Sequence, residues 1–220
     1  MIRVCPSTNP CPEDMLVQYA KDLQSMGVEV LHCDVMDGNF VASKCLPIEL
    51  INEVSRNTLM ALDVHLMISS PLKRVKDFLK LPIAYLTVHY EAFENEKDLI
   101  RTIDEIHSVG KLAGISVKPN TSIEEIKELL PLVDLVLIMS VEPGKSGQKF
   151  MAETLIKIKE LNAIKQKNGL NLIIEVDGGI NLDNAKLVID AGAEMLVMGN
   201  AFYTAKNKKE LLEKVQKLDK

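Results

Sequence analysis

VEVLHCDV, residues 28–35, is a short apolar run of the kind that forms a buried β-strand, and seven similar runs recur along the chain. Longer amphipathic, helix-like segments separate these runs. Strict alternation of strands and helices predicts parallel strands joined by right-handed crossovers. The predicted strands are 2–5, 28–35, 59–66, 84–89, 112–117, 134–140, 171–177 and 194–199, and the predicted helices are 12–26, 47–56, 71–80, 95–109, 121–131, 151–167, 181–191 and 207–218.

Eight strands and eight helices in 220 residues are typical of one α/β architecture, the closed (β/α)8 TIM barrel with eight parallel strands. An open doubly wound sheet usually has five or six strands, and the G-x-G-x-x-G motif of a dinucleotide-binding fold does not follow the first run. Because no linker or low-complexity segment interrupts the alternation, we expect residues 1–220 to form a single domain.

The charge balance and the cysteines restrict the class of protein. A net charge of −5 argues against a general nucleic-acid binder, which needs a basic surface to displace counterions from phosphates. No apolar run approaches the roughly 20 residues that cross a bilayer, and the first residues, MIRVCPS, lack the basic and apolar regions of a signal peptide. The four cysteines have no C-x-x-C spacing, so we expect reduced thiols in a cytoplasmic protein.

Polar side chains gather at the C-terminal ends of the predicted strands, where TIM-barrel enzymes place their active sites. Alternation along 28–35 puts His32 and Asp34 on one face of the strand and turns Cys33 to the other. His65 and Asp177 end two further strands. These four side chains predict a divalent metal site, because without a cation the charges would be left unpaired. Imidazole and carboxylate ligands without thiolate suit Zn, Fe(II), Mn or Co.

Two more acids share the inward face one layer deeper. Asp63 and Glu175 are each two residues from a predicted ligand, His65 and Asp177 respectively. They would either accept hydrogen bonds that fix the tautomers of the ligands or be buried charges paired elsewhere.

Glycines follow the last three predicted strands. Gly178 and Gly179 come directly after 171–177, Gly199 ends the last run and Asn200 follows it, and the loop 141–148 (VEPGKSGQ) follows the sixth. Glycine lets backbone N–H groups approach an anion closely, and the loops after the seventh and eighth strands often bind phosphate in this fold. We therefore expect a phosphate site at these loops.

Together these motifs resemble the ribulose-phosphate 3-epimerase family from residue 6 to about residue 202. That family is a (β/α)8 barrel that binds one divalent metal ion and interconverts D-ribulose 5-phosphate and D-xylulose 5-phosphate. The resemblance implies the same isomerase activity here, in the pentose phosphate pathway of carbohydrate metabolism, with a small-molecule sugar phosphate as substrate and a homo-oligomeric assembly. The matching segments are Pro6-Ser7, 32–38 (HCDVMDG), 62–67 (LDVHLM), 89–92 (HYEA), 135–143 (LVLIMSVEP) and 175–179 (EVDGG).

The resemblance also implies roles for single residues. Asp34 and Asp177 would be the acid/base pair, and together with His32 and His65 they would bind the metal. Epimerising a carbon next to a ketone removes a proton on one face and returns one on the other, through an enediolate that the metal stabilises. The residues expected to contact substrate are Ser7, His65, Met36, Met67, Met139, Gly144, Gly147, Gly178, Gly179, Gly199 and Asn200.

Three loops depart from the family pattern. Residues 8–12 (TNPCP) replace an Ile-Leu-Ser-Ala-Asp stretch, 41–46 (VASKCL) replace a Pro-Asn turn, and Lys145-Ser146 stand where Phe-Gly is common. These loops border the substrate, so the preference between a pentulose phosphate and a hexulose phosphate such as allulose 6-phosphate stays open. Lys145 would either face the phosphate or be solvated. A metal-dependent phosphohydrolase is the alternative of another class, whereas both acid/base carboxylates speak against a non-catalytic binding protein.

Overall fold

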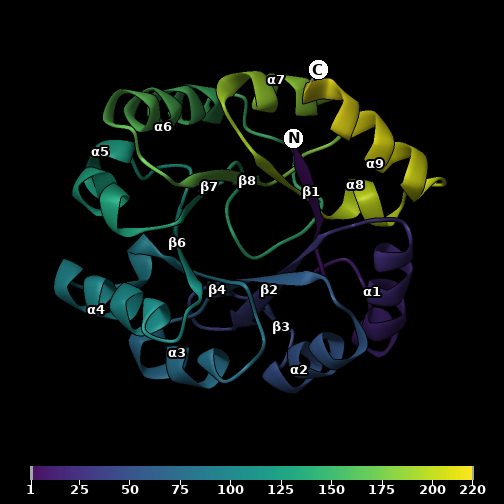
Figure 1. Cartoon of the computed structure of the whole chain (residues 1–220), viewed down its shortest axis with the longest axis horizontal. Helices are drawn as coiled ribbons and strands as arrows, with labels where there is room; N and C mark the ends of the chain where they lie inside the picture. Colours follow the sequence, from purple (N-terminus) through teal and green to yellow (C-terminus); the bar gives the residue numbers. More distant parts are fainter. Residues whose placement is uncertain (1, 220) are drawn as a thin grey trace.

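The computed structural model describes residues 2–219, and its parallel strands form a closed ring with the helices outside it (Figure 1). Each of the eight predicted strands overlaps one strand of the ring, in the order β1-β9-β8-β7-β6-β5-β4-β2. The predicted (β/α)8 barrel is therefore confirmed. The strands are β1 (Arg3–Pro6), β2 (Val30–Asp37), β4 (Ala61–Met67), β5 (Tyr85–His89), β6 (Leu112–Val117), β7 (Leu135–Met139), β8 (Ile173–Asp177) and β9 (Met195–Met198).

The ring closes between β1 and β2, just after the end of β1 and near the start of β2. Ser7 forms a parallel bridge with His32, and the backbone N–H of Thr8 donates to the carbonyl of His32 at 2.9 Å. The closing contact of the barrel therefore lies directly beside one of the predicted metal ligands.

The helices follow the predicted segments with small differences at their ends. Ser122 and Glu125 form a capping box, and Asn181 caps the last crossover helix through the N–H of Asp183. The predicted helix 121–131 is a single α-turn followed by a 3-10 helix (Lys127–Leu132), because Pro131 cannot continue an α-helix. The helices are α1 (Leu16–Ser25), α2 (Ile48–Asn57), α3 (Pro71–Leu79), α4 (Glu96–His107), α5 (Ile123–Ile126), α6 (Thr154–Asn168), α7 (Leu182–Ala191) and α9 (Lys208–Gln216).

Two short elements were not predicted. β3 (Lys44–Cys45) pairs antiparallel with the end of β2, and α8 (Asn200–Tyr203) follows the last strand. Both are shorter than the window over which a hydrophobic period can be recognised. Both border the C-terminal face of the barrel.

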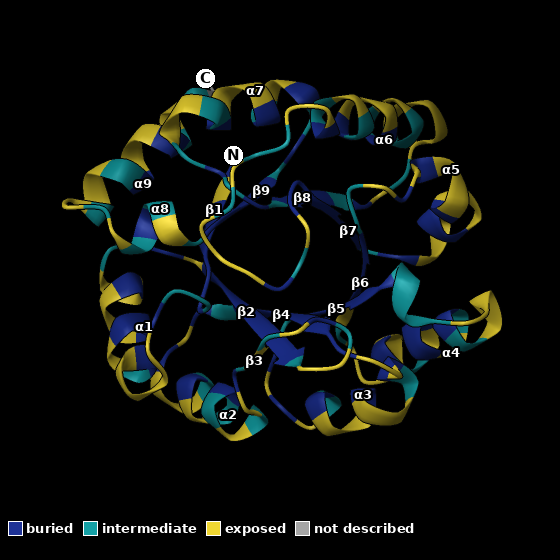
Figure 2. Cartoon of the chain, turned by 180° about the vertical axis from the view of Figure 1, so that it is seen from behind, coloured by how far each residue is buried: buried dark blue, intermediate teal, exposed yellow. Residues whose placement is uncertain are grey.

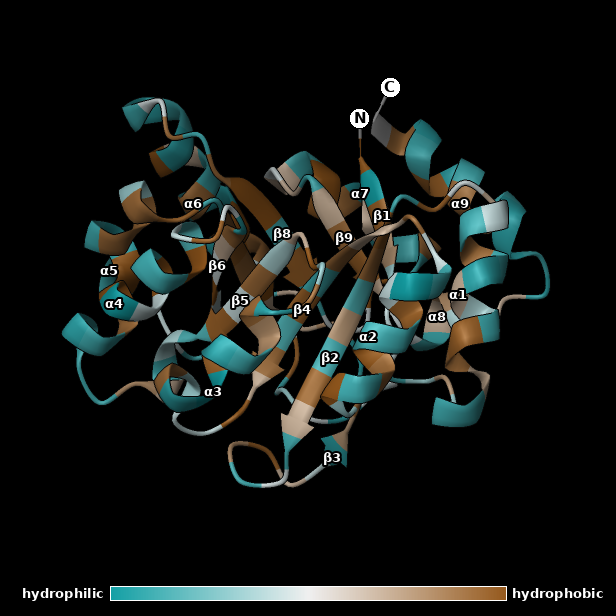
Figure 3. Ribbon diagram, turned by 60° about the horizontal axis from the view of Figure 1, so that its bottom comes forward, coloured by the Kyte–Doolittle hydropathy of each residue, from teal (hydrophilic) through white to brown (hydrophobic). Residues whose placement is uncertain are grey.

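Buried side chains form a shell between the ring and the helices, and the exposed residues lie mostly on the outer helix faces (Figure 2). On β2, Leu31, Cys33 and Val35 belong to this outer shell. The side chains between them, His32 and Asp34, point into the barrel, and hydrophilic bands interrupt the ribbon of β2 in Figure 3. The predicted orientation of Cys33, away from the site, is confirmed.

Among residues 2–219, none of the helices combines the length and the apolar character needed to cross a membrane. All four cysteines are free thiols.

Candidate metal centre and active site

The four predicted metal ligands meet at the C-terminal end of the barrel. One donor atom from each of His32, Asp34, His65 and Asp177 lies within 4.8 Å of the others. The parallel register of β2 and β4 pairs Asp34 directly with His65, and β8 brings Asp177 from the other side of the ring closure. Both imidazoles are fully buried, and Asp34 is 3% exposed.

Each ligand histidine presents one unpaired nitrogen to this cluster. Nε2 of His32 is 3.4 Å from Oδ1 of Asp34, and Nδ1 of His65 is 3.5 Å from the same oxygen. Both nitrogens are buried without a hydrogen-bond partner. Buried polar atoms are normally paired, so two orphan nitrogens beside two carboxylates fit a divalent cation with N and O ligands.

The two carboxylates differ in their protonation. Burial opposes ionisation of Asp34, but the neighbouring His32 outweighs it and lowers the pKa of Asp34 well below its ordinary value. Burial together with the charge of Asp34 raises the pKa of Asp177 to about 7. One carboxyl is thus held as a base, and the other can carry a proton near neutral pH.

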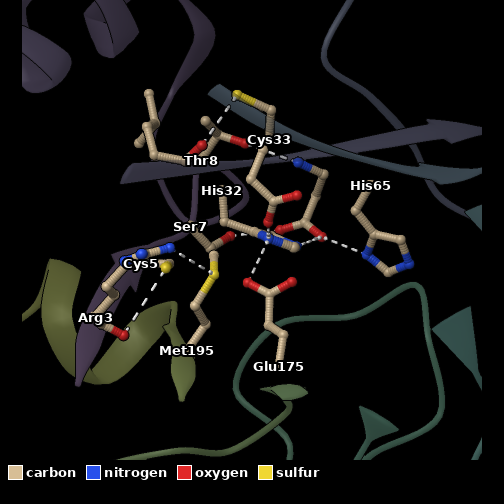
Figure 4. A network of polar contacts seen from close by, with 12 residues as sticks. Arg3, Cys5, Ser7, Thr8, His32, Cys33, His65, Glu175 and Met195 are labelled. Carbon is tan, nitrogen blue, oxygen red and sulfur yellow. Dashed lines mark hydrogen bonds and ion pairs between the residues drawn. The ribbon is translucent and has the colours of Figure 1, made fainter. Parts of the chain in front are cut away.

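Ser7 and Thr8 hold Asp34 in place. The hydroxyl of Ser7 donates to Oδ2 of Asp34 at 2.5 Å, and the backbone N–H of Asp34 donates to the hydroxyl of Thr8 at 3.2 Å (Figure 4). Ser7 was expected to contact the substrate. It does line the cavity above the site, but its hydroxyl proton is directed at Asp34.

The deeper acids behave differently from each other. Oδ2 of Asp63 lies 2.5 Å from Nδ1 of His32, so Asp63 accepts the hydrogen bond that leaves Nε2 of His32 free for a metal. Glu175 is 3.6 Å from the same nitrogen, too far for a hydrogen bond. Burial and the proximity of Asp63 raise the pKa of Glu175 to about 8, so this carboxyl is protonated at neutral pH.

A second set of contacts, made by His89 at the end of β5 and Glu91 just after it, was not predicted from the sequence. Nε2 of His65 lies 2.9 Å from Nε2 of His89, and Nδ1 of His89 lies 3.1 Å from Oε2 of Glu91. Glu91 also accepts hydrogen bonds from the backbone of Lys118 and the hydroxyl of Thr121. His89 lies at the end of a predicted strand. Only the register between β4 and β5 shows that it lies beside His65.

A cavity of about 210 Å³ opens above the four candidate ligands. The three methionines expected near substrate, Met36, Met67 and Met139, line it, and all three are almost fully buried. His65, also expected to contact substrate, is fully buried and does not line the cavity. The other expected substrate residues that line it are Ser7, Gly144, Gly147, Gly178, Gly179, Gly199 and Asn200.

The glycine pair after β8 adopts backbone conformations that exclude other side chains. Gly178 has φ +126°, and a Cβ there would lie 2.8 Å from the backbone nitrogen of Val141. Gly179 has φ +64°, and a Cβ there would collide with the backbone of Phe150. The loops after β7 and β8 therefore pack backbone against backbone at this end of the cavity.

The divergent loops meet across the cavity mouth. The hydroxyl of Ser43 donates to the carbonyl of Gly144 at 2.6 Å, and Val41 packs so closely that Gly144 has no room for a Cβ. Lys145 is exposed and lines the cavity. Lys145 and Ser146 thus line the cavity, whereas Thr8, in the divergent loop 8–12, contacts the predicted ligand Asp34.

Comparisons with known proteins agree with this geometry. The model of the Ribulose-phosphate 3 epimerase family matches residues 3–203. The chain is 39% identical over 217 residues to Ribulose-phosphate 3-epimerase of Bacillus subtilis (strain 168), covering 98% of this chain and 99% of that protein. It is also 39% identical over 215 residues to the chloroplastic Ribulose-5-phosphate-3-epimerase of Arabidopsis thaliana, covering 98% of this chain and 76% of that protein.

Solved structures confirm the fold alone. The 3-hexulose-6-phosphate synthase of Salmonella typhimurium superposes with a TM-score of 0.75 at 12% identity, covering 99% of this chain and 98% of that chain. The 3-keto-L-gulonate-6-phosphate decarboxylase of Vibrio cholerae gives the same TM-score and identity, covering 99% and 97%. The family match and the relatives carry the closer assignment: the chain belongs to the ribulose-phosphate 3-epimerase family, whose members are isomerases.

Proposed function

We propose that this protein is a metal-dependent ribulose-phosphate 3-epimerase that interconverts D-ribulose 5-phosphate and D-xylulose 5-phosphate. The observation that carries the proposal is the position of Asp34 and Asp177. Both belong to a cluster whose donor atoms lie within 4.8 Å, and both line the cavity above it. The relatives that the chain matches over nearly its full length carry the same enzyme name.

The two carboxyls act as the proton acceptor and donor in this proposal. Asp34, ionised beside His32, takes the proton from C3, while Asp177 delivers one to the other face. In the ring, β1 and β9 separate β2 from β8, so the two side chains approach the cavity floor from different directions. In the reverse direction their roles exchange.

The four ligand side chains His32, Asp34, His65 and Asp177 hold the cation in this proposal. A divalent ion there supplies Lewis-acid stabilisation for the negative charge that develops on the substrate oxygens. The ligand set suits Zn, Fe(II), Mn or Co. Asp63 supports it by keeping Nε2 of His32 free of a proton.

The remaining cavity residues hold the sugar phosphate. Met36, Met67 and Met139 give the reacting end an apolar wall that excludes water. Ser7 keeps Asp34 oriented toward the substrate. The phosphate end is assigned to backbone groups of the glycine-rich loops, at Gly144, Gly147, Gly178, Gly179, Gly199 and Asn200.

The test is to incubate the metal-loaded protein in deuterium oxide with D-ribulose 5-phosphate. Formation of xylulose 5-phosphate with deuterium at C3 is expected, and the absence of both would contradict the proposal. A parallel assay with allulose 6-phosphate compares the rates on a hexulose phosphate and on the pentulose phosphate. This comparison is needed because the loops at 41–46 and 142–148 border the cavity mouth, where they would contact the substrate. Release of inorganic phosphate would point to a phosphohydrolase instead.

The proposal extends to the whole protein. Residues 1–220 act as one domain, since the cavity draws on Ser7 near one end of the chain and Asn200 near the other. The free cysteines suit the reducing cytoplasm. The resemblance to the family supports a homo-oligomer, and sedimentation equilibrium measures its size.

A further inference from the structure

The metal ligand His65 ends a chain of hydrogen bonds that leads out of the site to Glu91. Nε2 of His65 is 2.9 Å from Nε2 of His89, and Nδ1 of His89 is 3.1 Å from Oε2 of Glu91. Both histidines are fully buried, so water offers neither ring an alternative partner. The only described nitrogen of this pair without a partner is Nδ1 of His65, which faces the metal cluster.

A contact between two imidazoles does not determine its own direction. A neutral imidazole has one donor and one acceptor nitrogen, so either His65 or His89 can donate across the 2.9 Å contact. If His65 donates from Nε2, its Nδ1 keeps a lone pair for a metal. If His89 donates, Nδ1 of His65 carries the proton and cannot be a ligand.

Glu91 decides between these two arrangements. Its Oε1 accepts from the backbone N–H of Lys118 at 2.7 Å and from the hydroxyl of Thr121 at 2.5 Å, which favours the ionised carboxylate. An ionised carboxylate only accepts, so Nδ1 of His89 carries the proton. Nε2 of His89 then accepts, and Nε2 of His65 donates.

We propose that Glu91 is a positioning residue, which acts through His89 to fix the tautomer of His65 that offers Nδ1 to the metal. The proposal rests on the metal site of the proposed function, but the tautomers themselves are a property of the metal-free protein. Glu91 also stands outside the cavity and touches neither the ligand cluster nor the substrate space.

A two-bond 1H–15N correlation spectrum of the 15N-labelled, metal-free protein reads the tautomers directly. The chain has four histidines, and the fourth, His107, is bonded to Asp134 away from the site. The expected result is a proton on Nδ1 of His89 and on Nε2 of His65. The opposite pattern in either ring overturns the proposal, and the measurement does not depend on turnover.

Glu91→Gln tests the causal step. The amide oxygen can keep the bonds from Lys118 and Thr121, which leaves the NH₂ group facing Nδ1 of His89. The whole chain then reverses, and Nδ1 of His65 becomes protonated. We expect the same spectrum to show the reversal and the Kd for Zn²⁺, measured against a chelator, to rise by about 10- to 100-fold.

Two matched variants separate this effect from loss of charge. Glu94→Gln removes one negative charge from the same loop at an exposed position and should leave the Kd unchanged. In a His89→Phe background the relay is absent, so adding Glu91→Gln should cost no further affinity. An equal loss in both backgrounds would refute the relay. If measurement of the unfolding temperature shows that Glu91→Gln does not fold, the wild-type spectrum still tests the predicted tautomers of His65 and His89. Absence of epimerase activity alone would count only against the proposed function.

Discussion

Replacing Asp177 by asparagine should make the metal-free protein more stable while it removes the activity. The pKa of Asp177 is raised to about 7 from an ordinary value of 3.8, through burial and the charge of Asp34. An ionised Asp177 therefore opposes folding in the absence of a cation. Asparagine has nearly the same shape and no charge, so Asp177→Asn relieves the repulsion.

The sign and the size of this change in the free energy of unfolding follow from the linkage between proton binding and folding. Between about pH 4 and pH 7 the folded state keeps the Asp177 proton that the unfolded state has lost, so stability falls as pH rises. The difference between 7 and 3.8 corresponds to about 4 kcal/mol at about 1.4 kcal/mol for each pKa unit. Because the side chain is partly exposed, we expect a gain of about 2 kcal/mol for the variant at pH 8 and none near pH 4.

Urea unfolding of chelator-treated wild type and Asp177→Asn, from pH 4 to pH 8.5, measures this difference. Epimerase assays of the same variants loaded with metal should show a loss of about 10²- to 10⁴-fold in kcat, the usual contribution of a general acid or base. Equal stabilities across the pH range would refute the electrostatic reasoning. Normal turnover in the variant would refute the acid/base role of Asp177.

Three further predictions concern the groups around the site. Asp63→Ala should weaken Zn²⁺ binding by about 10- to 100-fold, because His32 loses the acceptor that fixes its tautomer, and a normal Kd from chelator competition would contradict this. Gly179→Ala should destabilise the protein by more than about 1 kcal/mol in urea, because φ is +64° and the new Cβ meets the backbone of Phe150; an unchanged midpoint would show that the loop adapts. The pKa of Glu91 is lowered to about 2. The ionised Glu91 therefore stabilises the fold fully above about pH 4.5, and this stabilisation is lost as the pH falls toward 2. The acid-induced loss of stability in Glu91→Gln should lack this contribution.

The fold and the clustering of the four candidate ligands could be predicted because both depend on local periods in the sequence. Alternation along β2 placed His32 and Asp34 on the inner face and Cys33 on the outer one, and the structure has them there. Counting strand ends then brought His65 and Asp177 to the same rim, and their donor atoms do meet.

Contacts that depend on the register between neighbouring strands could not be predicted. His89 lies beside His65 because β4 and β5 pair Leu66 with Val88, and no pattern within either strand gives that offset. The bond from Ser7 to Asp34 likewise depends on how the ring closes. β3 was missed because two residues are too short to show a period.

The closure of the ring between Ser7 and His32 implies an order of events during folding. β1 pairs with β9, so Arg3 lies beside Met195, a partner almost the whole chain away. Contacts of such long sequence separation form late, after the entropy of closing the loop has been overcome. The hydrogen bonds that orient Asp34 come from Ser7 and Thr8, at that same seam. A partly folded chain therefore lacks the hydrogen bonds that orient Asp34, and we predict that a cation binds the completed barrel rather than guiding its assembly.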